Sequence, residues 1–517
     1  MAVNFLVTQY RKSPLRTPKN TIVLAADNWD DYSYKTTFSA TYYSSRGDST
    51  DLGNLKIGCT GQPKGWTSEL IPSAFENLAE NWFSLGQDVD YYKNLIECFG
   101  QSEQLEVLKA LRDVAANSEI FERADSEAVF VTSIMRSVST SVITGQFRRV
   151  ISGNAPLTEF HFSYRDPGSS ASPALRLDFK VTPESTPPTN IHVLIGRNGV
   201  GKTTLLNNIV RTILHIPTQL DHSVTIHDLD MWANDKEIEN NYFSSLVSVS
   251  FSAFDPFNPP PDQPDHSRGV AYFYVGMKTS RTGQPQTTSA AHKSPTQLTE
   301  DFVTSLDFCL NEPSRKQRWA RAVTKLQSDE NFADLNLCAI LDLEGTQAIR
   351  KARELMGELS SGHAIVLLTI TKLIQTVEEK TLVLLDEPES HLHPPLLSAF
   401  IRALEDLLFS RNGVAIIATH SPVVVQEVPK SCVWIINRVR TAGRVDRPTR
   451  ETFGENVGIL TREVFGLEVS KSGFHNLLEK RVSEGKTFDE IKAEFGDQLG
   501  MEARAVLMAL VAARDEE

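Results

Sequence analysis

The sequence predicts an α/β fold in which helical segments separate the buried strands of a sheet. The apolar runs in IHVLIG, TLVLLD and GVAIIATH have the length of buried strands, each ends in glycine or polar residues, and helical patterns separate them. In open α/β sheets the carboxyl ends of parallel strands meet at one edge, where ligands bind. We therefore expect the residues that follow these three runs to lie close together.

The segment 1–150 is predicted to form a β-rich and then helical region. Its first sixty residues contain strand-like runs separated by polar turns: NFLVTQY, NTIVLAA, YKTTFSATYY and LGNLKIG. From Ser68 onward the pattern turns helical, as in LIPSAFENLAENWF and EQLEVLKALRDVAANSEIFERA.

Loops and a helical segment divide the core. PFNPPPDQPDHSRG and TSRTGQPQTTSAAHKSPTQ are too rich in Pro, Ser, Thr and Gly for regular structure. They end a first lobe at 151–297, and a helical insertion at 298–358 follows. This insertion lacks sustained heptads, so no long coiled coil is expected. The second part of the core spans 359–440, with VWIINRV as its last strand, and 441–517 holds a charged linker and helices.

Composition limits the class of protein. No uncharged apolar stretch of eighteen residues occurs, and MAVNFLVTQYRKSPL lacks the apolar region of a secretory signal, so we expect a cytoplasmic protein without a membrane partner. The five scattered cysteines favour buried free thiols over disulfides or a zinc site. The net charge of -13 argues against coating nucleic acid through bulk electrostatics.

Local basic patches remain candidates for nucleic-acid contact. RKQRWARAVTK places Arg315, Arg318 and Lys325 near one helical face beside Trp319. A second patch lies in INRVRTAGRVDRPTR and comprises Arg438, Arg440, Arg444, Arg447 and Arg450. Either patch could meet a phosphate backbone or an acidic partner, although most such runs are solvated surface.

IHVLIGRNGVGKTTLLNNIV places an apolar strand, a glycine loop and a helix in order. The pattern Gly196-x-x-x-x-Gly201-Lys202-Thr203 is that of a phosphate-binding loop, because glycines let backbone N–H groups turn toward phosphates at a helix N-terminus. Lys202 is expected to reach the outer phosphates, and the Thr203 hydroxyl to ligate Mg²⁺. The alternative is a glycine turn before an ordinary helix. The predicted nucleotide-binding residues here are Arg197, Asn198, Gly199, Val200, Gly201, Lys202, Thr203 and Thr204.

Two further strands end in chemically active residues. In TLVLLDEPESHLHPP, the apolar strand is followed by Asp386, a candidate Mg²⁺ ligand, and Glu387, a candidate general base for the attacking water. GVAIIATHSP ends in His420, which we expect at the same edge, where it could donate to a γ-phosphate. Acidic residues and single histidines are also common at strand ends for structural reasons alone.

The stretch ELSSGH is compatible with two roles. Ser360 or Ser361 could cap the apolar helix that follows, although no Glu or Gln stands three residues on to complete a capping box. A helix N-terminus is also an anion site, so Ser360, Ser361 and Gly362 could grip a phosphate.

The order of these motifs, phosphate loop, LSSGH, LLDEPESHLHP and ATHSP, resembles the ABC-type ATPases. The resemblance implies a mixed sheet with helices and an antiparallel β subdomain, with ATP and Mg²⁺ as cofactors. It also implies a homodimer or higher homo-oligomer, in which Ser360, Ser361 and Gly362 complete the nucleotide site of a second subunit. DEPESHLHP and ATHSP are most similar to the soluble ATPases of the RecF and OLD type, without the TOPRIM nuclease domain of OLD proteins. Over His161 to Leu467 the chain most resembles the PtuA ATPases of Septu and retron-linked antiphage systems, which implies an HNH nuclease as companion and, in retrons, a reverse transcriptase with retron RNA or DNA.

The sequence departs from the family pattern in three places. His363 replaces the Gln or Glu usual at the end of the signature, and His393 replaces the aspartate of the D-loop. SLVSVSFSAFDPF has no glutamine where a Q-loop would place one, so Ser252 or Asp255 is the candidate replacement near the metal. These departures suggest slow hydrolysis.

The resulting hypothesis is an ATPase that acts as sensor or regulator of an antiphage complex and does not itself cut DNA. The alternatives are a RecF-like DNA-repair ATPase and a scaffold that binds ATP with little turnover. FHNLLEKRV and EARAVLMALVAA carry apolar residues at helical spacing, which need either the chain's own core or a partner to pack on.

Overall fold

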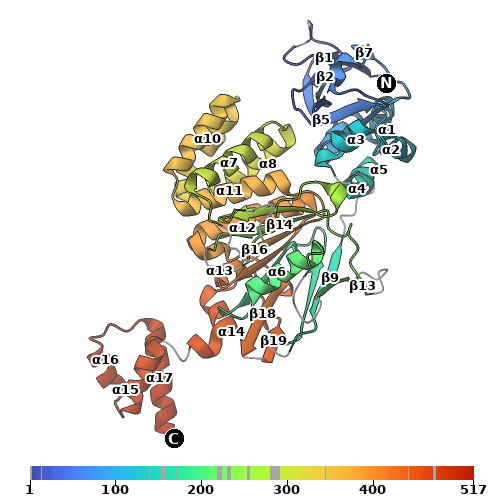
Figure 1. Cartoon of the computed structure of the whole chain (residues 1–517). Helices are drawn as coiled ribbons and strands as arrows, with labels where there is room; N and C mark the ends of the chain where they lie inside the picture. Colours follow the sequence, from blue (N-terminus) through green and yellow to red (C-terminus); the bar gives the residue numbers. More distant parts are fainter. Residues whose placement is uncertain are drawn as a thin grey trace.

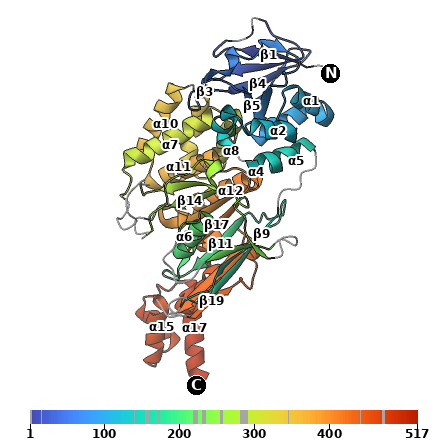
Figure 2. The ribbon, with the colours of Figure 1, turned by 45° about the vertical axis from the view of Figure 1, so that its right-hand side comes forward.

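The computed structural model describes residues 3–12, 14, 16–138, 140–152, 159–169, 173–217, 224–229, 235–252, 257–279, 291–343, 345–439, 442–469 and 473–516. The N-terminal sheet lies at one end of the molecule, the last three helices lie at the other, and the central sheet lies between them in both views (Figures 1 and 2).

The N-terminal unit is built on a six-stranded sheet with the order β7-β1-β2-β4-β5-β8. Its strands are β1 (Asn4–Thr8), β2 (Thr21–Ala26), β4 (Thr37–Tyr43), β5 (Ser49–Cys59), β7 (Ala74–Phe75) and β8 (Trp82–Gly86), with β3 (Tyr34–Lys35) and β6 (Gly65–Trp66) forming a separate pair. The helices that follow include α1 (Val89–Ala110), α2 (Ser118–Ala124), α3 (Ala128–Thr132) and α5 (Arg148–Ser152).

The prediction of a helix over LIPSAFENLAENWF is wrong. That segment contains β7 and runs into β8, which pairs antiparallel with β5 and is buried along its whole length. Trp82 and Phe83 are 7% and 3% exposed there, so cross-strand packing at the sheet edge outweighs a weak helical pattern. The helices expected over EQLEVLKALRDVAANSEIFERA are confirmed as the end of α1 and as α2.

Within the described residues, the central sheet has seven strands in the order β15-β14-β16-β17-β11-β18-β19. They are β11 (Ile191–Gly196), β14 (Ser245–Ser250), β15 (Ala271–Gly276), β16 (Thr381–Asp386), β17 (Val414–Thr419), β18 (Val433–Val439) and β19 (Ala442–Asp446). Every residue of β11, β16 and β17 is buried, which explains their continuous apolar runs, because a parallel sheet is covered on both faces.

Alternate residues of these strands enter two cores. In β11, Val193 and Ile195 pack with the helices on one face, whereas Leu194 packs with α6 (Lys202–Ile213) and the antiparallel sheet on the other. The helices of the first face are α7 (Pro295–Leu310), α8 (Pro313–Leu326), α10 (Thr346–Glu358), α11 (Ser361–Thr376) and α12 (Pro394–Arg411). The antiparallel sheet has the order β10-β9-β12-β13 and comprises β9 (Phe160–Asp166), β10 (Leu175–Val181), β12 (Thr225–Asp228) and β13 (Lys236–Glu237). The expected α/β class with an antiparallel subdomain is therefore observed.

The C-terminal segment differs from the expectation in one element. Part of the charged linker forms β19, which pairs antiparallel with β18. Beyond it lie α14 (Val457–Val469), α15 (Phe474–Ser483), α16 (Phe488–Glu494) and α17 (Met501–Glu516). The last three helices share a small hydrophobic core of Leu478, Val482, Ile491 and Leu507, so the tail packs largely on itself. Among the described residues, none of the helices is long and apolar enough to cross a membrane.

A buried ion cluster joins the N-terminal unit to the helices of the core. Asp88, the N-cap of α1, accepts hydrogen bonds from Arg318 of α8 at 3.0 and 3.4 Å and from Arg411 of α12 at 3.0 and 3.2 Å. Burial alone would raise the pKa of Asp88, but the two guanidiniums hold it well below its usual range. Arg318, one of the candidates for contact with a phosphate backbone or an acidic partner, is therefore buried in this cluster and does not lie at the surface.

The other members of the first basic patch differ in burial and in their partners. Arg315 is 8% exposed and pairs with Glu312, and Trp319 is fully buried with its indole N–H donating to Thr371 at 2.9 Å. Lys325 remains at the surface, where it pairs with Asp406.

Candidate nucleotide site

The phosphate loop lies between β11 and α6, at the carboxyl edge of the central sheet. Gly199 and Gly201 have φ values of 80° and 99°, in the left-handed region that favours glycine, and Gly201 is the N-cap of α6. At the other end of the loop, a Cβ on Gly196 would lie 2.3 Å from the carbonyl oxygen of Ile436 in β18. The glycines of the motif thus meet distinct local demands of turn geometry and strand packing.

Lys202 is 4% exposed, and its ammonium lies against the loop itself. It donates to the carbonyl oxygens of Gly196 at 3.0 Å and Arg197 at 3.1 Å. Burial lowers the pKa of Lys202, and the carboxylates of Glu387, Asp386 and Glu389 oppose that shift. Residues from two distant motifs of the sequence therefore share one electrostatic environment.

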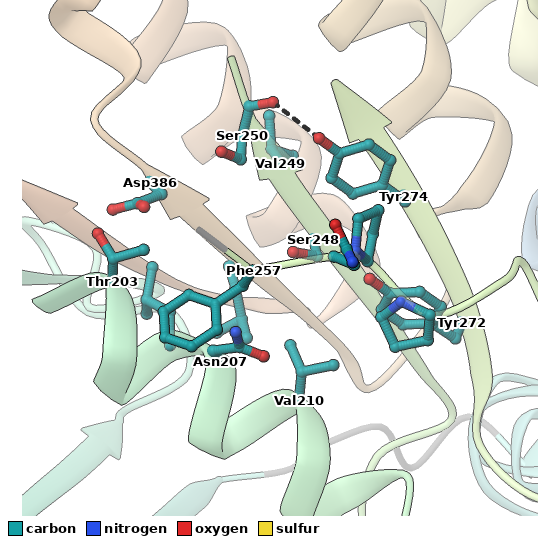
Figure 3. A pocket seen from close by; sticks show the side chains of 15 residues that line it. Thr203, Asn207, Val210, Ser248, Val249, Ser250, Phe257, Tyr272, Tyr274 and Asp386 are labelled. Carbon is teal, nitrogen blue, oxygen red and sulfur yellow. Dashed lines mark hydrogen bonds between the residues drawn. The ribbon is translucent and has the colours of Figure 1, made fainter. Parts of the chain in front are cut away.

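Thr203 and Asp386 line one small pocket of about 40 Å³ and lie next to each other there (Figure 3). The register of the strands explains this placement, because Asp386 ends β16 and pairs with Ala418 of β17, whereas Ile195 of β11 pairs with Thr419. A hydroxyl and a carboxylate are hard oxygen donors of the kind that Mg²⁺ prefers. The residues present thus fit the expected magnesium site.

The same pocket shows which residues stand where a Q-loop glutamine was expected. It is lined by Ser250, the last residue of β14, and by Asn258, in addition to Thr203 and Asp386. Ser252, the predicted replacement, is not among its lining residues, and Asp255 lies outside the described residues. Asn258 lies in PFNPPPDQPDHSRG, which was expected to be a loop without regular structure and was given no site residue.

Glu387 and His420 follow β16 and β17 and are brought together as predicted. Glu387 has φ 47° and ψ 57°, a left-handed conformation that is uncommon for a side-chain-bearing residue, and its N–H donates to the carbonyl of Ala418 at 2.8 Å. His420 Nδ1 lies 3.8 Å from Glu387 Oε1 and 3.2 Å from Glu389 Oε1. Glu389 was given no role from the sequence, although its place in DEPES is only two residues after the catalytic candidate Glu387.

Ser360 is the N-cap of α11, as one of the two interpretations predicts. Its hydroxyl oxygen accepts from the His363 backbone N–H at 3.4 Å and lies 2.6 Å from His363 Nδ1. His363 Nε2 and His393 Nε2 lie 3.4 and 2.8 Å from the two oxygens of Asp329. The two residues that depart from the family pattern, His363 and His393, are thus linked through one carboxylate of the helical insertion.

Gly362 has a structural reason to be glycine. A Cβ at this position would lie 2.4 Å from the carbonyl oxygen of His391, in the turn that follows β16. Any larger residue must displace backbone, so a Gly362→Glu variant would disturb this turn as well as add a charge. Ser361, the first residue of α11, is exposed and is the better position for a test.

The second basic patch is divided by the fold. Arg447 lies 3.6 Å over the ring of Trp434 and donates to the carbonyls of Val433 and Asp178, so it is structural. Arg444 is exposed and pairs with Asp446. Arg438 lies at the end of β18, where its Nη1 is 3.7 Å from the position of a Cβ on Gly201, and so its charge belongs to the phosphate loop. Arg450 is exposed, and Arg440 lies outside the described residues.

Comparison with known proteins identifies relatives at two levels. The family model described as "AAA domain, putative AbiEii toxin, Type IV TA system" matches residues 218–426. "Protein ea59" of Escherichia phage lambda is 44% identical over 516 residues, which cover 96% of each chain.

The solved structures that match this chain are more distant. A nucleotide-free ATP-binding cassette from an ABC transporter has 12% identity and a TM-score of 0.30, and covers 60% of this chain and 96% of its own. UvrA2 from Deinococcus radiodurans has 14% identity and a TM-score of 0.26, over 54% of this chain and 37% of its own. These scores carry no argument about activity.

Proposed function

The chain belongs to the family of protein ea59 of Escherichia phage lambda, and its residues 218–426 match the model of an AAA domain. We propose that it binds and hydrolyses ATP at the carboxyl edge of the central sheet. The observation that carries this proposal is the convergence of the phosphate loop with the ends of two other strands. Lys202, Asp386 and Glu387, far apart in the sequence, share one environment there.

Each group at this edge has a distinct task in the proposed reaction. The N–H groups of the loop and Lys202 bind and orient the phosphates. Thr203 and Asp386 would hold Mg²⁺, which, when bound, neutralises phosphate charge. Glu387 accepts the proton of the attacking water, and His420 donates to the γ-phosphate. Arg438 adds positive charge beside Gly201, which helps to balance the carboxylates of the site.

We further propose that two copies close head to tail on ATP. The N-terminus of α11 presents Ser360 and Ser361 at the surface, where its dipole and N–H groups would meet the γ-phosphate bound by the other copy. Because α11 also packs through Gly362 against the turn that follows Glu387, closure of the dimer would be coupled to the conformation of that turn.

Hydrolysis is tested first with variants of the two key charges. Lys202→Ala should weaken ATP binding by about 10–100-fold, since it removes a charge-assisted contact. Glu387→Gln should bind ATP normally but lower kcat by about 10²–10⁴-fold, because the water loses its base. Glu354→Gln, which changes an exposed carboxylate of α10, is the matched control and should behave as wild type.

The outcomes separate the alternatives. Equal kcat for wild type and Glu387→Gln would refute the role of Glu387. ATP binding without turnover in either protein would favour the scaffold. Stimulation of turnover by DNA, without any companion protein, would favour the RecF-like alternative.

Closure is tested by light scattering with Glu387→Gln as background. Ser361→Glu should block the ATP-dependent dimer, because the added carboxylate would face the γ-phosphate, while an acidic residue at a helix N-terminus favours the fold. Thr346→Glu places the same charge at the exposed start of α10 and is the control. Unchanged closure in Ser361→Glu would leave Ser360 and Ser361 with capping alone.

The finer role that we propose is regulation of a separate nuclease, an HNH enzyme, within an antiphage complex. This rests on the resemblance to the PtuA ATPases, and the relationship to a phage protein does not bear on it. No group of three or more His, Cys, Asp or Glu residues that could hold a metal occurs in the described part of the chain. Incubating the pure chain with plasmid, Mg²⁺ or Mn²⁺ and ATP is the trial, and DNA cleavage that requires residues outside the ATP site would overturn the division of labour.

A further inference from the structure

Glu389 is a buried carboxylate whose contacts converge on the end of β17. It lies in the short 3-10 turn Pro388–His391 after β16, and its side chain is 8% exposed. One oxygen, Oε1, accepts from the Thr419 hydroxyl at 2.6 Å and from the His420 backbone N–H at 2.7 Å, and lies 3.2 Å from His420 Nδ1. A single oxygen thus holds both the backbone and the ring of His420.

The ring contact decides how His420 presents its other nitrogen. At 3.2 Å, the Glu389 oxygen lies close enough to Nδ1 to favour a proton on that nitrogen, because a carboxylate oxygen can only accept. In the neutral ring Nε2 is then an acceptor, and it becomes a donor only when the ring holds both protons. A carboxylate at Nδ1 stabilises that doubly protonated form, as the aspartate does for the histidine of a serine-protease triad.

If Glu389 only held Thr419 and His420 in place, its side chain would not need to be charged. The second oxygen of Glu389, Oε2, is buried with no hydrogen-bond partner among the described residues, and an ionised group in that position is costly to desolvate. A neutral glutamine would accept the same bonds from Thr419 and the backbone at lower cost. The carboxylate also acts on the charge of Lys202, and Glu387 lies 3.8 Å from the same His420 Nδ1, so the charge of Glu389 acts within the proposed site.

We propose that Glu389 is a positioning residue for ATP hydrolysis: it orients His420 with Nε2 toward the γ-phosphate and stabilises the ring as a charged donor. This inference rests on the proposed ATPase function. It assigns to Glu389 a role in the catalytic step rather than in nucleotide binding, since it acts only through His420.

A double-mutant cycle tests this directly, with kcat and KM measured for wild type, Glu389→Gln, His420→Ala and the double variant. Glu389→Gln should lower kcat by about 10–100-fold, the range for loss of a charged hydrogen-bond partner, and change KM by less than about threefold. The double variant should be no slower than His420→Ala, because the two residues act as one unit. Thr419→Val, which removes a contact of Glu389 that does not reach the ring, should retain most of the activity.

Three results would overturn the inference: an unchanged kcat in Glu389→Gln, an effect confined to KM, or independent, multiplicative losses in the double variant. Should Glu389→Gln not fold, the ¹⁵N spectrum of histidine-labelled wild type, with the His420 signal assigned by its loss in His420→Ala, decides the matter. A proton on Nδ1 supports the inference, and a neutral ring protonated at Nε2 alone refutes it. Failure of the ATPase function itself is recognised separately, as wild-type turnover that does not depend on Lys202.

Discussion

Replacing Asp88 by asparagine should destabilise the junction between the N-terminal unit and the core more than any comparable surface change. The side chain is 3% exposed, and the guanidiniums of Arg318 and Arg411 that share it are each 7% exposed. Asparagine keeps the volume and is as good an N-cap for α1 as aspartate, so the substitution isolates the charge.

The magnitude follows from what each arginine retains. Arg318 keeps an ion pair with Asp90 at 3.0 Å, but both guanidiniums lose the buried carboxylate that they share. Breaking a buried ion pair from one side costs about 3–5 kcal/mol, because it leaves uncompensated buried charge. Since the guanidiniums hold the pKa of Asp88 below its usual range, this stabilisation is present above the unfolded pKa and is lost as pH falls through the folded pKa.

Urea unfolding of the full chain at neutral pH measures the loss in free energy of unfolding. Native-state hydrogen exchange in α1, α8 and α12 shows whether the loss lies at this junction. Asp90→Asn is the matched control: that side chain is 25% exposed, and Arg318 keeps Asp88, so the cost should be about 0–1 kcal/mol. Adding Arg411→Met to Asp88→Asn should recover part of the stability. A change of less than 1 kcal/mol in Asp88→Asn, with exchange in the three helices as in wild type, would refute the reasoning.

Three other changes follow from single contacts. Burial raises the pKa of Asp113 to about 7, so the native state keeps a proton that the unfolded chain releases near pH 4. The free energy of unfolding of the wild type should therefore fall by about 4 kcal/mol from pH 4 to 7. The urea midpoints at pH 5 and 7.5, which differ in the wild type for this reason, should converge in Asp113→Asn. Arg438→Ala should raise the KM for ATP several-fold, whereas Arg444→Ala, from the same segment, should not; equal KM values would place the Arg438 charge outside the site. Gly362→Ala should lower the melting temperature, because its Cβ would press on the carbonyl of His391, and an unchanged melting temperature would show that the turn yields freely.

Much of the site could be predicted because its chemistry is local. The phosphate loop requires glycines with positive φ at fixed spacing before a helix, and apolar runs buried on both faces are recognisable without any partner. Asp386, Glu387 and His420 were located by the strands they follow, since parallel strands bring their carboxyl ends to one edge.

Other features depended on pairing across long distances. Whether Trp82 belonged to a helix or to a strand was decided by β5, which comes earlier in the chain and offers an edge. Arg318 lies in a basic run of the sequence, and only the fold brings Asp88, 230 residues away, into contact with it. Arg438 also lies in a basic run, and only the pairing of β18 with β11 places it beside the phosphate loop. Helical or strand periodicity says which face a residue occupies but not what covers that face.

By itself, then, the sequence determined the secondary-structure periods, the phosphate loop and the strand ends that bear the catalytic candidates. Tertiary structure alone decided which charges are buried, that Asn258 lines the pocket of Thr203 and Asp386, and that Glu389 reaches His420. The physical reason is that backbone conformation and turn chemistry act between near neighbours in the chain, whereas desolvation and hydrogen-bond pairing depend on groups that only the packed fold brings together.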